Sequence, residues 1–346
     1  TGVSNFITLQ KGQIYQLLGA NSDAIGGASN SGLELTGTSI RSLSQGKPIS
    51  VFSGSSRTTN PANCGIGGGD NDMVQSFPLH VWGRKYLTAP LAASTSATHM
   101  STNIYKVIVN DPLTVVTRNG VVLTGLLNNS YYIFESNEPA YIVSNKPILL
   151  GQFMTAGNCT AGIGDPDMYY LSPLKAGVKK VNCVRSSKEG ISVNFVTLII
   201  PTAGINSLLI DGAATFNHSY IHPSLSGYSV IVKSWPAAIS QFTIESDSAF
   251  TGVSYGMGNV ESYGYNIGAN FNPSNGTDRM MPMTWTGSIS MNWFNPDNWS
   301  TASVPTEIDH VLIPGGTTYT PAIPSGLAAH CKSISLESGA TINVGT

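Results

Sequence analysis

The sequence predicts an all-β protein, and three observations support this prediction. Apolar and polar residues alternate over short runs, for example at 105–109 and 193–199, which is the period of a strand with one buried face. The 37 glycines and 19 prolines, together with hairpin signals such as Asn119-Gly120, indicate many tight turns. Charged residues make up only 10% of the chain, so its surface relies on hydroxyl and amide groups. The expected architecture is an antiparallel β-sandwich or super-sandwich.

A weak internal repeat runs through the first three quarters of the chain, and we expect about three pseudo-repeats. Each copy reads as a strand, a glycine turn, a strand with tyrosine and a strand entered through a polar turn. The first two copies share Lys-Pro-Ile, at 47–49 and 146–148. One such unit cannot bury its apolar face alone, so the units are expected to stack. The copies begin at residues 6–15, 115–120 and 208–212, and end at residues 46–53, 145–153 and 242–250.

The composition changes after the third copy. Residues 272–283 are rich in Asn, Ser, Gly and Pro without apolar alternation, so they are expected to form a linker. Short alternating runs return at 311–313, 333–336 and 341–344. We therefore expect a β domain at 1–271, the linker at 272–283 and a small β module at 284–346. Both ends of the chain look cut from a longer polypeptide.

The charge balance limits the partners that the protein can have. Seventeen basic residues against nineteen acidic ones leave no strong basic patch for nucleic acid. No apolar run approaches the length of about 18 residues that a membrane span needs, so direct membrane insertion is not expected. The surface, rich in Ser, Thr and Asn, indicates an extracellular or cell-surface protein.

The four cysteines fall into two pairs by context. Cys64 and Cys159 lie in Gly/Asn loops that follow equivalent strands of the first two repeats, so these loops should meet and a disulfide is expected between them. Cys183 and Cys331 lie in strand-like patterns and are expected to be free thiols.

No catalytic motif appears, so neither an enzyme nor a required cofactor is expected. Two glycine-bearing loops carry closely spaced carboxylates, which are ligands that Ca²⁺ prefers, and a weak calcium site is one hypothesis. The alternative is Asx-turn bonding to the local backbone. The carboxylates are Asp70 and Asp72 in one loop and Asp165 and Asp167 in the other.

Two further groups of residues have competing interpretations. His218 and His222 have the spacing of a helical metal pair, but in a β context they would lie about 13 Å apart, so polar loop residues are expected. Trp285, Trp293 and Trp299 form either a stacking platform for sugars or the core of the small module.

Partner contacts are expected on loops, because the sheet faces must bury the alternating apolar residues. The longest glycine-rich loops are 20–33, 53–72 and 155–167. We expect the last two to meet, with Trp82 and Met168 near them, in one polar and nearly neutral patch.

Several motifs resemble one known family in the same order along the chain. The stretch 163–174, Ile-Gly-Asp-Pro-Asp-Met-Tyr-Tyr-Leu-Ser-Pro-Leu, resembles the Gly-Asp-Pro-x-Met…Leu-x-Pro motif of the N-terminal domain of the IgG Fc-binding protein family. Further similar motifs lie at 46–54, 81–86, 198–212, 246–256 and 260–266. The resemblance covers about residues 1–270, and it implies a non-enzymatic domain outside the cell.

The tail resembles a different unit. Its Trp-x-Gly…Asn-Trp…Asn-Trp…Val-Pro pattern over 284–346 is similar to repeats in very large surface proteins of Bacteroidota. These are gliding and biofilm adhesins exported by the type IX system, and the pattern often opens a β-solenoid. The two resemblances together imply a bacterial cell-surface protein.

We therefore expect a non-enzymatic adhesion or structural module of a very large secreted surface protein. Its partners would be surface glycans or proteins, or neighbouring domains of the same chain. The alternative is a carbohydrate-binding module of a secreted glycan-degrading enzyme, which a tryptophan platform would serve.

Overall fold

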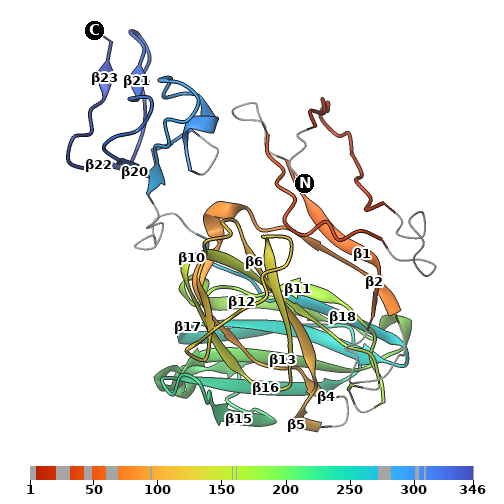
Figure 1. Cartoon of the computed structure of the whole chain (residues 1–346). Coiled ribbons are helices and arrows are strands. Elements are labelled where there is room, and N and C mark those ends of the chain that lie inside the picture. The colour runs from red at the N-terminus through yellow and green to blue at the C-terminus, as the bar shows by residue number, and fades with distance from the viewer. Residues whose placement is uncertain are drawn as a thin grey trace.

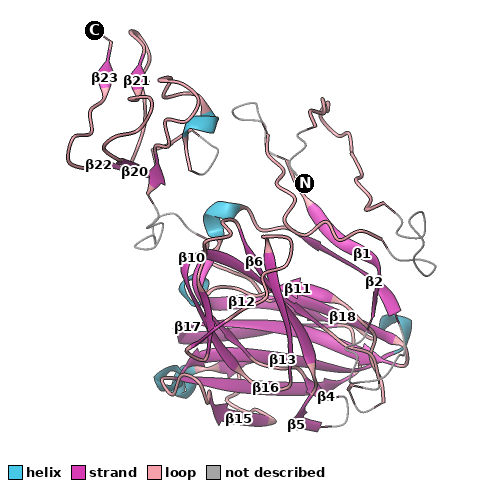
Figure 2. Cartoon of the chain, in the orientation of Figure 1, coloured by secondary structure: helices cyan, strands magenta, loops and turns pink. Residues whose placement is uncertain are grey.

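The structure consists of short strands, three-residue helical turns and loops, as the sequence predicts (Figures 1 and 2). The computed structural model describes residues 5–20, 32–42, 49–59, 69–93, 96–157, 159–160, 162–271, 282–300, 304–307 and 309–345. We call residues 5–75 the first unit, 83–170 the second unit, 178–266 the third unit and 283–344 the tail.

The second unit and the third unit each form a seven-stranded sheet around one long strand. The second unit contains β3 (Gly83–Thr88), β4 (Ala92–Ala93), β5 (Ser96–Met100), β6 (Asn103–Val109), β7 (Val116–Arg118), β8 (Val121–Val122), β9 (Tyr131–Ser136), β10 (Ala140–Phe153) and β11 (Met168–Tyr170). The third unit contains β12 (Val178–Arg185), β13 (Ile191–Pro201), β14 (Leu209–Ile210), β15 (His218–Ile221), β16 (Tyr228–Pro236), β17 (Ser240–Gly258) and β18 (Glu261–Asn266).

The two sheets repeat one pairing scheme. The first half of β10 pairs antiparallel with β3 and β7, and its second half pairs with β6 and β11. The first half of β17 pairs in the same way with β12 and β14, and its second half with β13 and β18. Beyond them, β9 pairs with β6 as β16 pairs with β13. The repeat predicted from the sequence is thus confirmed for these two units.

The turns after β7 and β14 are equivalent down to their hydrogen bonds. Asn119 and Asp211 both have a φ of 52°, and each precedes a glycine with positive φ. The Asn119 N–H donates to the Tyr141 carbonyl and the Asn119 side chain accepts from the Tyr141 N–H, at 2.9 and 2.8 Å. Asp211 makes the same two bonds with Thr243, at 2.8 and 3.1 Å. This two-way clasp fixes the register of the turn on the long strand.

The first unit is built differently from the other two. Its strands β1 (Phe52–Thr59) and β2 (Gly69–Gln75) form a sheet of two, and the predicted strand at 6–10 is absent. The turn itself forms, since the Gln13 N–H donates to the Gln10 carbonyl at 3.0 Å. The described segments beside this turn belong to no strand, although the Leu33 N–H donates to the Ala20 carbonyl at 2.9 Å, and Phe6 is 80% exposed. An alternating pattern therefore did not suffice to form a strand here.

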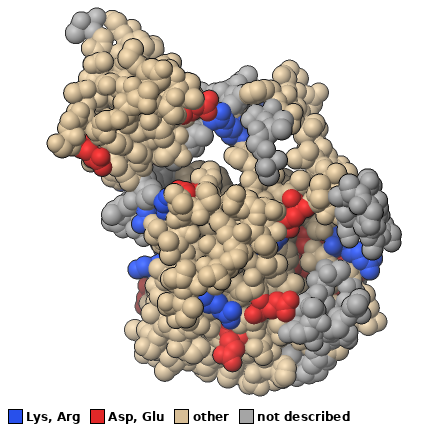
Figure 3. All heavy atoms as spheres, viewed as in Figure 1, with Lys and Arg blue, Asp and Glu red and all other residues tan. Residues whose placement is uncertain are grey.

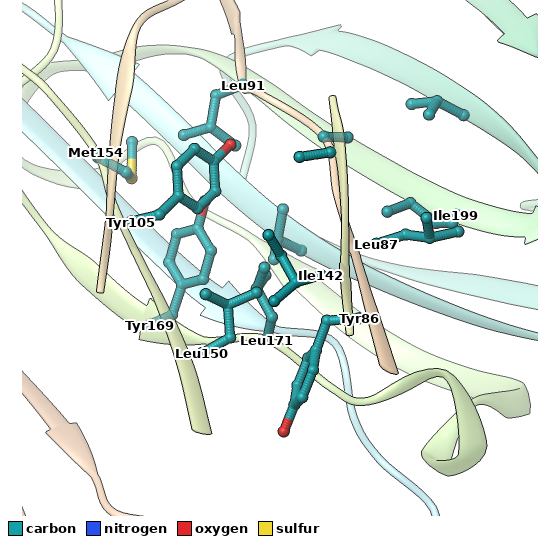
Figure 4. Packing of buried hydrophobic residues seen from close by; sticks show 14 of the residues in the cluster. Tyr86, Leu87, Leu91, Tyr105, Ile142, Leu150, Met154, Tyr169, Leu171 and Ile199 are labelled. Carbon is teal, nitrogen blue, oxygen red and sulfur yellow. The ribbon is translucent and has the colours of Figure 1, made fainter. Parts of the chain in front are cut away.

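The largest core lies between the second and third units. Figure 4 shows Tyr105 and Tyr169 packed beside Leu150 and Met154 in this core. Buried residues of β13, β16 and β17, among them Phe195, belong to the same cluster. A second core, within the third unit, packs alternate residues of β13 against residues of β12 and β17. The third unit is therefore a sandwich whose outer face also packs against the second unit.

Hydrogen bonds also cross the interface between these units, and two of them join buried groups. The Ala92 N–H donates to the Tyr255 hydroxyl at 2.8 Å, and His222 Nε2 lies 3.1 Å from the Thr88 carbonyl oxygen. His222 is fully buried and follows β15, which begins at His218. The expectation that both histidines are polar loop residues is therefore wrong, because His222 serves as an internal tie.

Short helical turns connect the units, and two further ones connect strands within the third unit. They are η3 (Leu79–Val81), η4 (Leu174–Ala176), η5 (Lys188–Gly190) and η6 (Thr202–Ser207). Turns η3 and η4 occupy equivalent places between consecutive units, and their preceding prolines, Pro78 and Pro173, have nearly identical backbone angles. Among the described residues, no helix is long and apolar enough to cross a membrane.

The tail uses parallel pairing, unlike the units before it. It contains β19 (Met283–Thr284), η8 (Pro296–Asn298), β20 (His310–Ile313), β21 (Ala322–Ile323), β22 (Ser333–Leu336) and β23 (Asn343–Val344). Strands β19, β20 and β22 form one parallel sheet, and β21 pairs parallel with β23. Short parallel strands that recur along the chain are the arrangement of a β-solenoid.

Candidate functional site

The best candidate site is a pair of equivalent acidic segments, residues 69–72 and 164–167, which we call the acidic loop pair. The structure places Asp70 and Asp72 in the first residues of β2 and not in a loop as expected, because both pair with residues of β1. The register shows that the loops are equivalent, because Phe52 pairs with Gln75 as Gly151 pairs with Tyr170. Asp72 and Asp167 each lie three residues before the second partner of those pairs. The repeat therefore places one acidic loop of the first unit and one of the second at the same position of the fold.

Two of the four carboxylates hold backbone groups. Asp72 is only 4% exposed, and its Oδ1 accepts from the Ser55 N–H at 2.6 Å while its Oδ2 accepts from the Thr58 hydroxyl. Asp167 accepts from the Met168 N–H and the Gly264 N–H, both at 2.7 Å. The Asp72 bonds span the register shift between β1 and β2, and the Asp167 bonds fix the segment that leads into β11.

The other two carboxylates differ in exposure. Asp70 is partly exposed, and its side chain accepts from the neighbouring Asn71 N–H at 2.7 Å. Asp165 is 5% exposed, its carbonyl accepts from the Ser262 hydroxyl at 2.7 Å, and its buried Oδ1 has no hydrogen-bond partner among the described residues. Asp70 is thus the carboxylate best placed to meet a partner.

The charges of the first loop act on the carboxylates of the second. Burial raises the pKa of Asp167 to about 6, and the charges of Asp72 and Asp70 add to this rise. Burial also raises the pKa of Asp165, with a further contribution from Asp70. For Asp72, burial outweighs its hydrogen bonds and raises the pKa as well. The carboxylates of the first loop therefore help to raise the pKa values of the carboxylates in the second loop.

The bonding pattern favours the Asx-turn interpretation of these carboxylates. No group of three or more Asp, Glu, His or Cys side chains in the described part of the chain could hold a metal ion. Calcium needs six to eight oxygen ligands, whereas Asp72 and Asp167 already use both of their oxygens on backbone and hydroxyl donors. Calcium binding at the four aspartates stays a prediction without a preformed cage to support it.

The sequence did not reveal that the third unit contributes to this site. Ser262 and Gly264 of β18 contact the second acidic loop. A Cβ atom on Gly264 would lie 2.8 Å from the Tyr169 ring, so the glycine allows this close approach. A glycine inside a strand pattern, in Tyr-Gly-Tyr, was the one signal available.

Trp82 and Met168 lie beneath the loop pair, on the apolar cluster that joins the first two units. The cluster contains Leu149, Met168 and Tyr170, with Trp82 and Phe77 packed against it. The Trp82 indole N–H donates to the Phe77 carbonyl at 3.0 Å. The loop pair is therefore supported by packed side chains. Of the other expected loop, residues 21–31 lie outside the described residues, as do residues 60–68.

The two cysteines that were expected to be free thiols are confirmed as such. Cys183 and Cys331 are free thiols, and burial raises the pKa of Cys183 to about 11. Cys159 is not among the free thiols. Its expected partner, Cys64, lies outside the described residues, so the bond between them stays a prediction.

The three tryptophans of the tail form its core. Trp285, Trp293 and Trp299 are at most 2% exposed, and their rings meet edge to face at 5.0 and 4.7 Å. The buried Asn298 accepts from two backbone N–H groups and donates to two oxygens, which accounts for the second Asn-Trp of the pattern. Buried rings present no face to a sugar, so the core interpretation replaces the platform interpretation.

A small pocket lies among the described residues. A pocket lined by Leu87, Gln152 and Thr197, among others, has a volume of about 20 Å³, which holds about one water molecule. Charged side chains are sparse and scattered on the face that Figure 3 shows. The acidic loop pair can present hydrogen-bonding groups to a partner.

Comparison with known proteins gives two matches along the chain. A family model described as IgGFc binding protein matches residues 1–256, and a domain of unknown function, DUF8693, matches residues 284–346. No curated protein and no solved structure matches. The first match covers the first two units and the third unit as far as Gly256 in β17, and the second covers the tail.

Proposed function

Because the chain belongs to the IgGFc binding protein family, we propose that it is a non-enzymatic binding module that acts outside the cell. Within that class we propose an adhesion or structural role in a very large bacterial surface protein. The tail supports this role, since its short parallel strands suit one end of a longer repetitive stalk. An origin in Bacteroidota and export by the type IX system belong to the same proposal and rest on the tail pattern alone.

The observation that carries the proposal is the acidic loop pair. Two equivalent loops of neighbouring units are held on a packed scaffold, and one carboxylate, Asp70, is left partly exposed. Binding sites often sit on loops positioned by a rigid framework. A partner of this patch would be a protein or glycan surface that offers hydrogen-bond donors.

The organisation of the chain follows from this role. We propose a binding domain at 1–271, a linker at 272–283 and a separate β module at 284–346, which neighbouring domains of the same chain would extend. The Cys64–Cys159 disulfide would fasten the first unit to the second beside the acidic loop pair. Calcium would be an optional ligand of the exposed carboxylate.

An attachment assay tests the proposal. Beads coated with the complete chain are flowed over bacterial or host cell surfaces and over immobilised immunoglobulin Fc, in salt of roughly 0.15 and 0.5 M. We expect attachment to one of these surfaces that survives the higher salt, because the patch has few charges to screen. The Asp70→Asn variant should reduce attachment several-fold, while Asp247→Asn, an exposed aspartate on β17, should not change it.

Three results would contradict the proposal. Attachment no better than uncoated beads would remove the binding role, and loss of attachment at the higher salt would indicate a long-range charge effect instead. Equal attachment of the two variants would show that the acidic loop pair is not the contact. Selective capture of one oligosaccharide on a glycan array would favour the alternative, a carbohydrate-binding module of a secreted enzyme.

A further inference from the structure

The outer edge of β9 in the second unit has no neighbouring strand, whereas the equivalent edge in the third unit is covered. In the sheet of the second unit, β9 is the last strand, beside β6. Its counterpart in the third unit is β16, because β9 pairs with β6 as β16 pairs with β13. Figure 1 shows β15 beside β16, and the two strands pair antiparallel on the side away from β13. Among the described strands, none takes this place beside β9.

The connection that leads into β9 is shorter than the one that leads into β16. The equivalent turns lie at Asn119 and Asp211, and the equivalent residues of the two edge strands are Tyr131 and Val230. Twelve positions separate the first turn from its edge strand and nineteen separate the second, and β15 lies within the longer connection. The shorter connection closes on itself, since the Leu127 N–H donates to the Tyr131 carbonyl at 2.8 Å. It therefore does not supply a strand of its own.

Two residues of β9 turn their backbone groups to this open edge. The Val109 N–H donates to the Ser130 carbonyl at 2.8 Å, so even-numbered residues of β9 bond to β6. Successive residues of a strand alternate in direction, so the N–H and C=O groups of Ile133 and Glu135 point away from β6. These groups have no backbone partner among the described residues. The open edge thus offers two donors and two acceptors.

The third unit shows what an edge of this kind binds. Val232 and Ser234 are the counterparts of the two edge residues. The Val232 carbonyl accepts from the Asn217 N–H at 2.9 Å, and the Ser234 N–H donates to the Asn217 side chain at 2.8 Å. Beside them, His218 of β15 pairs with Val232. An extended antiparallel segment therefore satisfies the same edge one unit later.

The side chains at the open edge indicate the chemistry of its occupant. Ile133 is 50% exposed, whereas its counterpart Val232 is fully buried. Glu135 is exposed, and none of the ion pairs of the described residues includes it. An aliphatic side chain opposite Ile133 and a basic one opposite Glu135 would complement both.

The open edge also continues an interface that exists within the chain. Lys106 pairs with Ile133 across the two strands, and its Nζ lies 2.9 Å from a carboxylate oxygen of Glu34 in the first unit. A segment of the first unit therefore already contacts the face to which Ile133 belongs. An added strand would extend this covered face by one position beyond β9.

We propose that the outer edge of β9 is an acceptor site for an extended segment of a partner protein, which joins the sheet as an antiparallel strand. The segment carries an aliphatic side chain opposite Ile133 and, two residues before it, a Lys or Arg opposite Glu135. Backbone bonds give the affinity and the alternating side chains give the specificity. A second copy of this chain fits less well, because it would bring two Glu135 carboxylates to one short edge. This surface is separate from the acidic loop pair and goes beyond the proposed function.

A short peptide tests the acceptor site on the complete chain. The probe has the order Ser-Thr-Lys-Thr-Val-Thr, which places Lys opposite Glu135 and Val opposite Ile133. The control is the same peptide with methylated backbone nitrogens at Lys and Val, because those two N–H groups would donate to β9. Amide hydrogen exchange is read residue by residue at roughly 1 mM peptide, since two residue pairs give weak affinity.

We expect alternate protection along β9. The amides of Ile133 and Glu135 should exchange at least about twofold more slowly with the probe than with the control. The amides of Tyr132 and Phe134 should not change, because they already face β6. Glu135→Lys should reduce the protection, and a probe with Glu in place of Lys should restore it in that variant.

Three results would overturn the proposal. Equal exchange with probe and control would show that the edge accepts no strand. Equal slowing of even-numbered and odd-numbered amides would indicate a general stabilisation of the protein and not pairing at the edge. Protection of Ile133 and Glu135 without peptide, increasing with protein concentration, would assign the edge to a second copy.

Discussion

The second unit and the first unit carry the same Lys-Pro-Ile sequence and equivalent acidic loops, yet only the second forms a complete sheet. The difference lies in the neighbours, because β10 has partners on both sides, whereas β2 is the one partner of β1 among the described strands. A strand gains its ladder bonds and its buried face from other strands. Two segments with one pattern can therefore reach different structures within one chain.

The largest expected effect compares one buried and one exposed phenylalanine. Phe195 is 2% exposed and stacks on Tyr255 with ring centroids 5.1 Å apart, whereas Phe6 is 80% exposed. Phe195→Ala should lower the free energy of unfolding by about 3–5 kcal/mol, and Phe6→Ala by less than about 0.5 kcal/mol. Urea denaturation of both variants checks this. A cost above about 1 kcal/mol for Phe6→Ala would show that the first unit is packed in solution.

The disulfide gives the next largest effect, since it would tie the incomplete unit to a complete one. Cys64 and Cys159 are 95 positions apart, and a bridge that closes such a loop contributes about 2–5 kcal/mol in the chain-entropy model. Cys159→Ser should therefore destabilise the protein by this order, and Cys183→Ser should cost less. Non-reducing peptide mapping should find Cys64 joined to Cys159. A bridge from Cys64 to Cys183 or Cys331 would contradict the equivalence of the two loops.

The pH dependence compares the two acidic loops. Burial raises the pKa of Asp167 to about 6, against about 3.9 in an unfolded chain, so the folded state holds this proton more tightly. The stability from this proton is fully present below about pH 4 and is lost as the pH rises through 6. Relative to Asp167→Asn, the free energy of unfolding of the unmodified protein should fall by on the order of 2 kcal/mol between pH 4 and 7.

Asp72→Asn provides the matched measurement for the first unit. Burial raises the pKa of Asp72 in the same direction, so its pH dependence should have the same sign. Chemical denaturation at four pH values between 4 and 7 would measure both variants. If the free energy of unfolding of the unmodified protein, relative to Asp167→Asn, increased as the pH rises, Asp167 would be ionised in the folded protein throughout this range.

The smallest expected effect concerns the turn clasp. Asn119→Gly keeps the positive φ but removes the hydrogen bond between its side chain and the Tyr141 N–H. The substitution should therefore lower the free energy of unfolding by about 1 kcal/mol. At the equivalent position of the first unit, Lys11→Gly should cost a few tenths of a kcal/mol, because no long strand receives a clasp there. Thermal denaturation of the two variants checks this pair. Equal costs would show that the clasp does not distinguish the units.

Much of the fold could be predicted from local pattern. Alternation located β6, β13 and β16, and Asn119-Gly120 located a hairpin turn, because these features depend on residues close in sequence. The two-stranded sheet of the first unit could not be predicted from local pattern, since strand pairing depends on residues far away in the chain. The parallel pairing of the tail could not be predicted either, because apolar and polar residues alternate alike in parallel and antiparallel sheets.

The candidate site was predicted in its residues and less well in its chemistry. The Asp-x-Asp spacing located both acidic loops, but whether a carboxylate binds a metal or caps the backbone depends on where nearby N–H groups point. Similarly, three tryptophans close in sequence indicated a cluster without telling whether their rings face inward. His222 was misplaced because its partner, Thr88, is 134 residues away.

The core shared by the second and third units has a consequence for how this protein can evolve. Phe195, Val232 and Tyr255 of one unit and Tyr105, Ile142 and Leu150 of the other belong to one buried cluster. A gene rearrangement that removed either unit would leave half of this cluster in water, at a cost larger than the stability of a typical domain. The pair is therefore the smallest piece that duplication or shuffling can move intact.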